Sequence, residues 1–484
     1  GANMQFWPMG NFFRSCGAFF LRRSFQGDDL YRAVFNKYVQ TLIDEGVPIE
    51  FFIEGGRSRT GKMAMPKYGL LSTVVQAFHD GKNDDLALVP VYLGYDRIVE
   101  ESSYMKELGG EEKTKEKALD ILKSSNILRK RFGNVYVNIG EPIKLKEYFA
   151  SLPVKYEELA LDERQALYRK ISYEIVGAIT KVSVVTPFSF ISLALLSHDY
   201  RGISHDDLWE CMELFRDYLS NKNVMLSRTF DEEERMIKNT LQKFEQMNFI
   251  SKISVDEEID DGDEIVYSLD DKKRFTIEYY KNNILHFFLP ISFFALSVIH
   301  HNDDKVFLRD VSTDYTFLKQ FFRHEFIFDD NVSDEKEIAE VLSYLEANGS
   351  ISRFGNEDAS GVIVTGLGRK KMERFGALTK NYIESYWVVI RAVAYLKNKP
   401  LSEKDFLKRA MSLGNMLHKK GEIRRAEALS QANFLNAMRY LREQGLLIAE
   451  DKKEKGDKKI TRYYQLTDDK TALETMRRKV FRFI

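Results

Sequence analysis

A short apolar segment that runs into two glycines constrains the fold of this chain more than any other feature. Residues 49–53 have the length of a buried strand, and Gly55-Gly56 then allow a sharp turn and the close approach of a ligand. Three cations follow within six residues: Arg57, Arg59 and Lys62. Cations on a glycine-rich turn are typical of an anion site, with Glu54 able to orient an arginine. The alternative is a solvated basic turn.

The same segment partly matches a nucleotide-binding loop. Gly56-x-x-x-x-Gly61-Lys62 fits most of the P-loop pattern. Met63 stands, however, where the Ser or Thr that holds Mg²⁺ would be, and arginines occupy the loop that should wrap the phosphates. Pro66 also predicts a helix that starts several residues too late. Nucleotide binding is therefore the weaker interpretation of this loop.

Residues 1–160 alternate strand and helix patterns. We expect helices that begin at Asp28-Asp29 and end at Gly46, from about Tyr68 to Phe78, and from about Glu112 to Arg131. Strands are expected at 17–21, 49–53, 86–95 and 135–139. This alternation predicts an α/β domain with a mainly parallel sheet flanked by helices, in which ligands bind beyond the carboxyl ends of the strands.

Residues 161–484 are expected to form a mostly α-helical C-terminal region. Two apolar stretches, 184–196 and 284–299, contain Pro187 and Pro290 and are too short to span a bilayer. We interpret them as buried core helices, and docking on a membrane surface is the alternative.

A weak internal repeat also marks the C-terminal region. Three helices end near Ile250, Ile351 and Ile448, and each is followed by a strand pattern. A helix followed by a β-hairpin resembles a winged-helix module. Acidic residues at 256–264 oppose contact with phosphates, so we interpret these units as packing or interaction modules rather than DNA readers.

Composition excludes several classes of function. The 72 Lys and Arg balance 73 Asp and Glu, so no general nucleic-acid partner is expected. Cys16 and Cys211 are the only cysteines, and they provide neither a disulfide framework nor zinc spacing. The sequence therefore predicts no metal site and no cofactor.

Three segments, in order, carry a family resemblance. Residues 17–25 read GAFFLRRSF, residues 52–59 read FIEGGRSR, and residues 89–96 read VPVYLGYD. They resemble the second, third and fourth sequence blocks of glycerolipid acyltransferases. The Gly-Gly-Arg-Ser-Arg form is similar to the glycerol-3-phosphate and dihydroxyacetone-phosphate enzymes. Segments 11–25, 136–142 and 279–286 further resemble the large bacterial membrane-associated glycerol-3-phosphate acyltransferases.

The resemblance implies a reaction and a location. The intact protein would transfer an acyl group from acyl-CoA or acyl-carrier protein to the sn-1 hydroxyl of glycerol 3-phosphate. It would lie peripherally on the cytoplasmic face of the cell (inner) membrane, in contact with surface lipids. Dihydroxyacetone phosphate is the alternative substrate, and a nucleotide-binding or winged-helix regulator is the alternative class of protein.

The resemblance also implies roles for residues. By this resemblance, the substrate-binding residues of the chain are Arg23, Glu54, Gly55, Gly56, Arg57, Ser58, Arg59 and Pro90. The three arginines would clamp the phosphate, because a planar guanidinium makes bidentate contacts. Glu54 would hold an arginine or a glycerol hydroxyl, and the glycines would let the backbone approach. Pro90 would shape the acyl-donor side.

The family's general base belongs to a His-x-x-x-x-Asp block upstream of residue 17. His79 with Asp84, and His324 with Asp329, match this spacing, but both follow residue 17. We therefore assign no catalytic residue within this chain. The expectation is that residues 1–484 bind glycerol 3-phosphate without acylating it, since general-base help contributes roughly 10²–10⁴ in rate.

Overall fold

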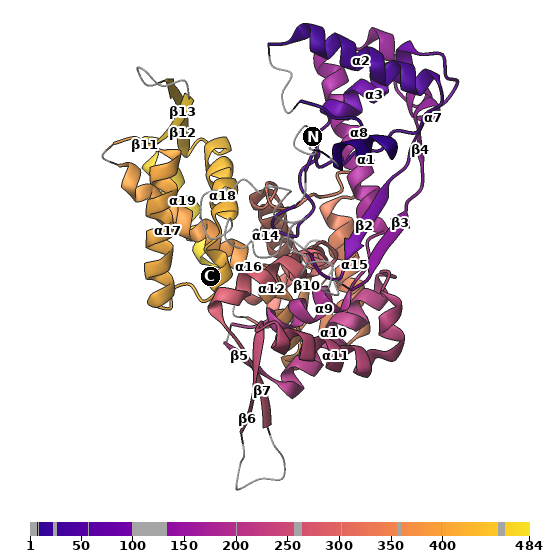
Figure 1. Cartoon of the computed structure of the whole chain (residues 1–484). Coiled ribbons are helices and arrows are strands. Elements are labelled where there is room, and N and C mark those ends of the chain that lie inside the picture. Colours follow the sequence, from indigo (N-terminus) through magenta and orange to yellow (C-terminus); the bar gives the residue numbers. More distant parts are fainter. Residues whose placement is uncertain are drawn as a thin grey trace. The chain divides into compact units, whose positions relative to one another are not determined.

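The computed structural model describes residues 7, 9–22, 27–56, 58–98, 133–199, 201–255, 264–301, 303–355, 360–397, 399–453 and 460–484. These residues group into two compact units (Figure 1). The first holds the described parts of Gly1–Arg57, Met65–Val99 and Glu112–Ser183. The second holds Val184–Ile484 together with the short segment Ser58–Ala64. The glycine-rich loop of the sequence therefore contributes residues to both units.

Helices are the main regular elements of the first unit. They are α1 (Met9–Ser15), α2 (Asp29–Asp44), α3 (Gly69–Asp80), α7 (Leu145–Ala150) and α8 (Leu161–Lys181). The Asp28 side chain caps α2 by accepting the Tyr31 N–H at 2.9 Å, and Gly46 ends this segment at φ +72°. These are the start and stop signals that the sequence predicts. The apolar face of α2 buries Phe35, Val39 and Ile43.

The mainly parallel sheet expected for the first unit is not formed among the described residues. Strands β1 (Ala87–Leu88) and β4 (Ile143–Lys144) pair antiparallel, as do β2 (Val91–Tyr95) and β3 (Val135–Ile139). Residues 18–22 and 49–52 form no ladder, although their composition suits a strand. A strand requires a partner for its backbone N–H and C=O groups, and composition alone cannot provide one. The predicted helix at 112–131 lies outside the described residues.

The second unit repeats one order of elements three times. The first repeat contains β5 (Gly202–Ser204), α10 (His205–Asn221), α11 (Glu233–Gln246), β6 (Ile250–Val255) and β7 (Glu264–Leu269). The second contains β8 (Lys305–Phe307), α14 (Leu308–Phe321), α15 (Asp334–Ala347), β9 (Ile351–Phe354) and β10 (Gly361–Val364). The third contains β11 (Leu401–Ser402), α17 (Glu403–Lys419), α18 (Gln431–Glu443), β12 (Leu447–Lys453) and β13 (Ile460–Leu466).

Each repeat forms its own antiparallel three-stranded sheet. The returning strand of the hairpin lies in the middle, in the orders β5-β7-β6, β8-β10-β9 and β11-β13-β12. Serines at the ends of the leading strands cap the following helices, because the Ser204 and Ser402 hydroxyls accept the N–H groups of Asp207 and Asp405 at 3.1 Å. The helix and hairpin of each repeat fall where the sequence predicts them, and the short leading strand is additional.

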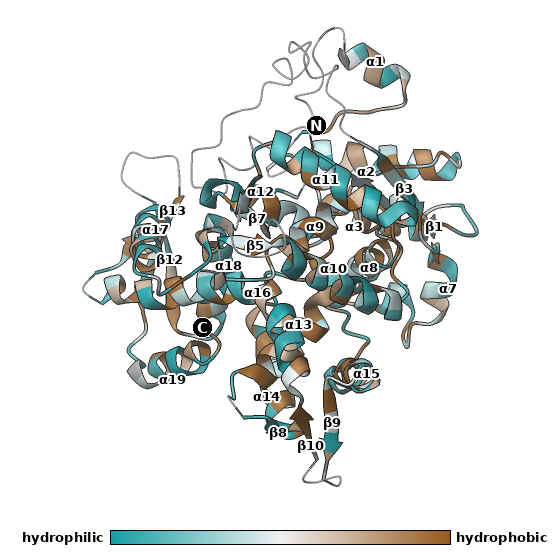
Figure 2. Ribbon diagram, turned by 90° about the horizontal axis from the view of Figure 1, so that it is seen from below, coloured by the Kyte–Doolittle hydropathy of each residue, from teal (hydrophilic) through white to brown (hydrophobic). Residues whose placement is uncertain are grey.

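Further helices form the interior of the second unit: α9 (Pro187–Leu195), α12 (Asp271–Asn282), α13 (Leu289–Ile299) and α16 (Gly366–Ala392). Helix α19 (Lys470–Phe481) packs on α16 and is mostly exposed or half-buried. Every residue of α9 is buried, and so are nine of the eleven residues of α13. Helix α9 packs against α10, α11 and α12, and α13 packs against α14, α15 and α16 (Figure 2). The two apolar stretches are thus core helices, as the sequence favours.

Within the described part of the chain, no single helix is both long enough and apolar enough to cross a bilayer. The pair Asp271–Asn282 and Leu285–Ile299, bent by 74°, meets that criterion on length and composition alone.

Candidate substrate-binding site

The turn expected at Gly55-Gly56 is present in the first unit. The Gly55 N–H donates to the Phe52 carbonyl at 2.9 Å, and the Lys67 N–H donates to the Ile53 carbonyl at 2.8 Å. Gly55 has φ +63°, and a Cβ there would lie 2.8 Å from the Lys67 side chain. Glycine is therefore required at Gly55 for conformation as well as for space. Ile53 is buried beneath the turn, and Gly55 and Gly56 are exposed.

The continuation of the loop, residues 58–64, is held within the second unit. The Asn282 side-chain amide donates to the Thr60 carbonyl at 2.8 Å. Gly61 has φ +78°, and a Cβ there would lie 1.9 Å from the Tyr279 carbonyl oxygen. The backbone of this segment therefore lies directly against the end of α12, at a distance that only glycine permits.

Lys62 fixes the same segment by its charge. Its ammonium group forms a buried ion pair with Glu325, and the two side chains are 9% and 0% exposed. The Lys62 Nζ also lies 4.4 Å from the centre of the Tyr382 ring and 5.4 Å from that of Phe326. Lys62 is thus a structural anchor, and the sequence interpretation that counted it among the anion-binding cations is wrong.

The geometry of Lys62 also weakens the nucleotide-binding alternative. A P-loop lysine must reach the β- and γ-phosphates of a nucleotide. Here the ammonium group already has a carboxylate and two aromatic faces as partners. Sequence reasoning missed this role because Glu325 follows Lys62 by 263 residues.

The other predicted binding residues are placed only in part. Arg23 and Arg57 lie outside the described residues, so the phosphate clamp stays a prediction. Glu54 and Ser58 are half-buried and Arg59 is exposed. Pro90 is buried between β1 and β2, where its carbonyl accepts the Gly140 N–H at 2.8 Å.

The two histidine pairs with catalytic spacing have other partners in the structure. The His79 ring lies 4.5 Å from that of Tyr156, and its Nδ1 lies 3.8 Å from the Glu157 carboxylate. His324 Nε2 lies 2.7 Å from the carboxylate of Glu443, the last residue of α18 in the third repeat. His79 Nε2 also lies 4.0 Å from Asp80, so the contacts of these two histidines are with carboxylates other than Asp84 and Asp329.

Two family models match this chain, one after the other along the sequence. Residues 1–94 match the acyltransferase family model. Residues 104–450 match the model described as the glycerol-3-phosphate acyltransferase C-terminal region, which is more than half of the chain. The chain belongs to the glycerol-3-phosphate acyltransferase family. The resemblance derived from the sequence blocks is thereby confirmed.

Relatives named glycerol-3-phosphate acyltransferase are similar over long stretches. One from Pasteurella multocida is 36% identical over 66% of this chain and 39% of its own length. One from Haemophilus influenzae is 30% identical over 92% of this chain and 54% of its own length. One from Actinobacillus pleuropneumoniae is 29% identical over 94% of this chain and 55% of its own length. The chain thus spans about half the length of the curated relatives it matches.

In this member of the acyltransferase family, buried charges surround the anchor of the loop. Lys281 donates to Asn381 Oδ1 at 3.0 Å, and Asn381 donates to Glu278 Oε1 at 2.6 Å. Asn282, which holds Thr60, accepts the Tyr382 hydroxyl at 2.7 Å. Burial raises the pKa of Glu278 to about 7. Sequence reasoning missed this network, because charged residues in a helix ordinarily indicate a solvated face.

Proposed function

We propose that the intact protein is a glycerol-3-phosphate acyltransferase that transfers a fatty acyl group from acyl-CoA or acyl-carrier protein to the sn-1 hydroxyl. The observation that carries this proposal is the match of residues 104–450 to the family's C-terminal region, with the acyltransferase blocks in front of it. The names of the relatives support the same substrate. Dihydroxyacetone phosphate remains the alternative substrate, since it carries the same phosphate.

The phosphate clamp is assigned to Arg23, Arg57 and Arg59. Arg59 precedes the anchored residues of the loop, so the contacts of Thr60, Gly61 and Lys62 limit where its backbone can lie. Glu54, Gly55, Gly56 and Ser58 complete the loop, and Pro90 is assigned to the acyl-donor side. A loop held at its end gives up less conformational freedom when the substrate binds.

Replacing Arg57 by lysine is expected to weaken the binding of glycerol 3-phosphate about tenfold or more. Lysine keeps the charge and loses the two-pronged contact, and a hydrogen bond to a charged group contributes roughly 1.5–3 kcal/mol. Isothermal titration of the chain with glycerol 3-phosphate measures the change. Lys82→Gln, at an exposed position after α3, is the matched control. Equal affinity in the Arg57→Lys and wild-type proteins would remove Arg57 from the site.

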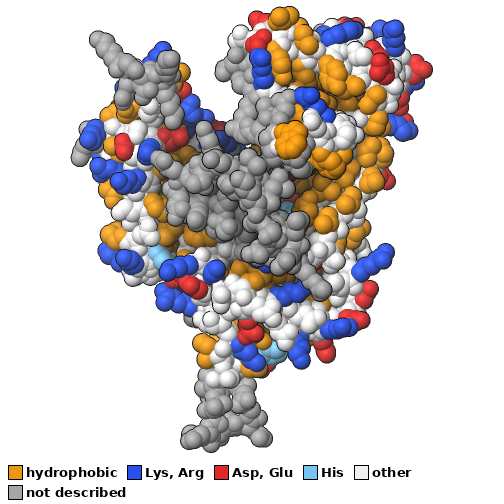
Figure 3. All heavy atoms as spheres, viewed as in Figure 1, with side chains coloured by type: hydrophobic (Ala, Val, Ile, Leu, Met, Phe, Trp, Pro, Cys, Tyr) orange, Lys and Arg blue, Asp and Glu red, His pale blue; other side chains and the backbone are white. Residues whose placement is uncertain are grey.

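We further propose that the protein lies peripherally on the cytoplasmic face of the cell membrane. Helices α9 and α13 are buried, so the supporting surface is one face of β2 and β3 (Figure 3). Three cross-strand apolar pairs share that face: Val91–Ile139, Leu93–Val137 and Tyr95–Val135. Their side chains are between 38% and 69% exposed. A continuous exposed apolar face of this kind marks an interaction surface.

Vesicle flotation tests the membrane proposal. The chain is expected to float with vesicles of phosphatidylethanolamine and phosphatidylglycerol. The Val137→Glu protein is expected to lose most of this binding, because moving a carboxylate from water into the apolar part of the bilayer is unfavourable. Ile448→Glu is the control, since Ile448 is an exposed apolar residue on β12. Equal flotation of the Val137→Glu and wild-type proteins would contradict docking through this face.

The three repeats of the second unit are proposed to be winged-helix-like interaction modules. Each has a leading strand, two helices and a hairpin, in that order. Acidic residues occupy the first turn of the second helix in two repeats, Glu233 and Glu234 in α11 and Asp334, Glu335 and Glu337 in α15. Carboxylates there repel phosphates, so packing within the enzyme is favoured over regulation by DNA binding.

A further inference from the structure

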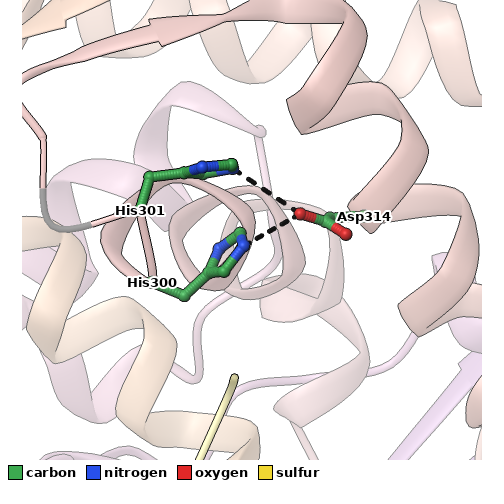
Figure 4. A group of neighbouring side chains, drawn as sticks. All are labelled: His300, His301 and Asp314. Atoms are coloured by element: carbon green, nitrogen blue, oxygen red, sulfur yellow. Dashed lines mark ion pairs between the residues drawn. The ribbon is translucent and has the colours of Figure 1, made fainter. Parts of the chain in front are cut away.

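Two histidines and an aspartate converge in the second unit, where the end of α13 meets the first helix of the second repeat (Figure 4). His300 and His301 directly follow α13, and Asp314 belongs to α14. The Asp314 Oδ2 atom lies 3.0 Å from His300 Nε2 and 3.6 Å from His301 Nε2. His300 and Asp314 are each 5% exposed at the side chain, and His301 is 27% exposed.

Both ring nitrogens that face the carboxylate lack hydrogen bonds. His300 Nε2 and His301 Nε2 are inaccessible to solvent and make no hydrogen bond of acceptable geometry, and their contact with Asp314 Oδ2 is an ion pair only when the rings are protonated. Buried polar atoms in native proteins are nearly always paired, and an exception calls for a water or an ion. Two such atoms within one cluster, both beside a carboxylate oxygen, point to a cation held between them.

Hydrogen bonds on the far side of the His300 ring and of the Asp314 carboxylate favour the same assignment. His300 Nδ1 lies 3.2 Å from the Leu296 carbonyl, which can only accept, so the Nδ1–H donates there. In the neutral ring with that proton, Nε2 is the nitrogen that carries the lone pair for a metal. The other oxygen of Asp314, Oδ1, accepts from Arg482 at 2.9 Å. Each carboxylate oxygen thus has a separate partner. Metal-binding histidines and carboxylates are ordinarily oriented by hydrogen bonds of this kind on their far atoms.

Two of the three distances between the candidate ligand atoms suit a small divalent ion, and all three atoms lie within 4.8 Å of one another. Nitrogen and oxygen ligands lie about 2.0–2.2 Å from a tetrahedral zinc ion and therefore about 3.3–3.6 Å from one another. The distances of 3.0 and 3.6 Å from Asp314 Oδ2 lie close to that range. His300 and Arg482 also line a cavity of about 940 Å³. A water molecule would be the fourth ligand of a tetrahedral ion with three protein ligands.

We propose that His300, His301 and Asp314 bind a divalent transition-metal ion of the zinc type. The ion would be held by the two Nε2 atoms and Asp314 Oδ2, and it would fix the end of α13 to α14. This site was not expected from the sequence, because the cluster forms only when α14 packs on α13. Without a metal, the alternative is that Asp314 forms ion pairs with His300 and Arg482 alone. The positive charge of Arg482 opposes the metal, but its side chain is 44% exposed and is therefore partly screened.

Zinc titration of the whole chain, free of any histidine tag and stripped with a chelator, tests the site. One ion per chain is expected to bind, and Co²⁺ is expected to give the visible absorption of a site with nitrogen and oxygen ligands. His301→Asn keeps the His300–Asp314 pair and is expected to weaken binding at least tenfold. His324→Asn is the matched control, because His324 lies in the same unit beside the Glu443 carboxylate.

Two results would overturn the proposal. One is that the wild-type chain binds no zinc, which would leave the metal-free ion pair as the role of the cluster. The other is that zinc binds the His301→Asn and His300→Asn proteins as tightly as the wild type, which would place the ion elsewhere. Asp314→Asn offers a second variant of similar shape if His300→Asn does not fold, with circular dichroism recording the fold of each protein.

Discussion

The Lys62→Met protein is expected to unfold at a clearly lower urea concentration than the wild type. The substitution leaves the Glu325 carboxylate, whose side chain is 0% exposed, without its cation. Removing one partner of a buried ion pair costs about 3–5 kcal/mol, because the remaining charge stays buried and uncompensated. Contact of the ammonium group with the Tyr382 and Phe326 rings is lost as well. Urea unfolding followed by tryptophan fluorescence measures the change.

Two further proteins separate the anchor from a general effect of charge. Lys67→Met removes an exposed lysine five residues along the same loop and is expected to leave the unfolding midpoint nearly unchanged. The double variant Lys62→Met/Glu325→Met removes both charges and is expected to recover much of the loss, since neither member of the pair is left buried without its partner. If Lys62→Met were as stable as Lys67→Met, the ion pair would not hold the segment.

The anchor connects this stability effect to the proposed function. Lys62 lies three residues after Arg59, and Gly61 allows the backbone to lie against Tyr279. Loss of the anchor is therefore expected to weaken glycerol 3-phosphate binding along with stability, whereas Arg57→Lys is expected to weaken binding alone. The two variants thus distinguish a residue that positions the loop from one that contacts the substrate.

Local signals explain what the sequence predicted correctly. Helix α2 begins after Asp28 and is followed by Gly46 because capping and a positive φ depend on nearby residues. Strand β3 lies at 135–139, where the apolar pattern places it. The leading strands β5 and β11 have three and two residues, too few to show a period of two. Pairing partners, by contrast, are not encoded locally, and the parallel sheet expected from the sequence is not formed among the described residues.

In the candidate site, too, features set by neighbouring residues could be predicted, and contacts between residues far apart in the sequence could not. Gly55 and the turn that it forms were visible in the sequence, because a glycine pair after an apolar segment has a local meaning. The partner of Lys62 was not visible, since Glu325 is brought to it only by folding of the second unit. Lysine is seldom buried, and its residue type alone predicts an exposed side chain.

A second large loss of stability is expected for Glu427→Gln. The Glu427 carboxylate and the Arg274 guanidinium form a buried pair, with Nη2 and Oε1 3.0 Å apart and side chains 3% and 1% exposed. Glutamine keeps the shape but leaves the arginine charge uncompensated, which costs about 3–5 kcal/mol. The control is Glu422→Gln, whose partner Arg391 lies 3.2 Å away on the surface and whose side chain is 42% exposed. That pair is expected to contribute less than about 1 kcal/mol.

The ion pair of Arg274 and Glu427 also predicts how the free energy of unfolding depends on pH. Burial alone would raise the pKa of Glu427, but the charge and hydrogen bonds of Arg274 lower it to about 2. An unfolded glutamate has a pKa of about 4.3. Because the folded pKa is the lower one, the stabilisation is fully present above pH about 4.3 and is lost as the pH falls toward about 2. It amounts to roughly 3 kcal/mol, at 1.36 kcal/mol per pKa unit. Urea unfolding between pH 6 and pH 3 should therefore show that the free energy of unfolding falls more steeply with falling pH in the wild type than in Glu427→Gln. An equal fall in the two proteins would mean that Glu427 is not the group that titrates.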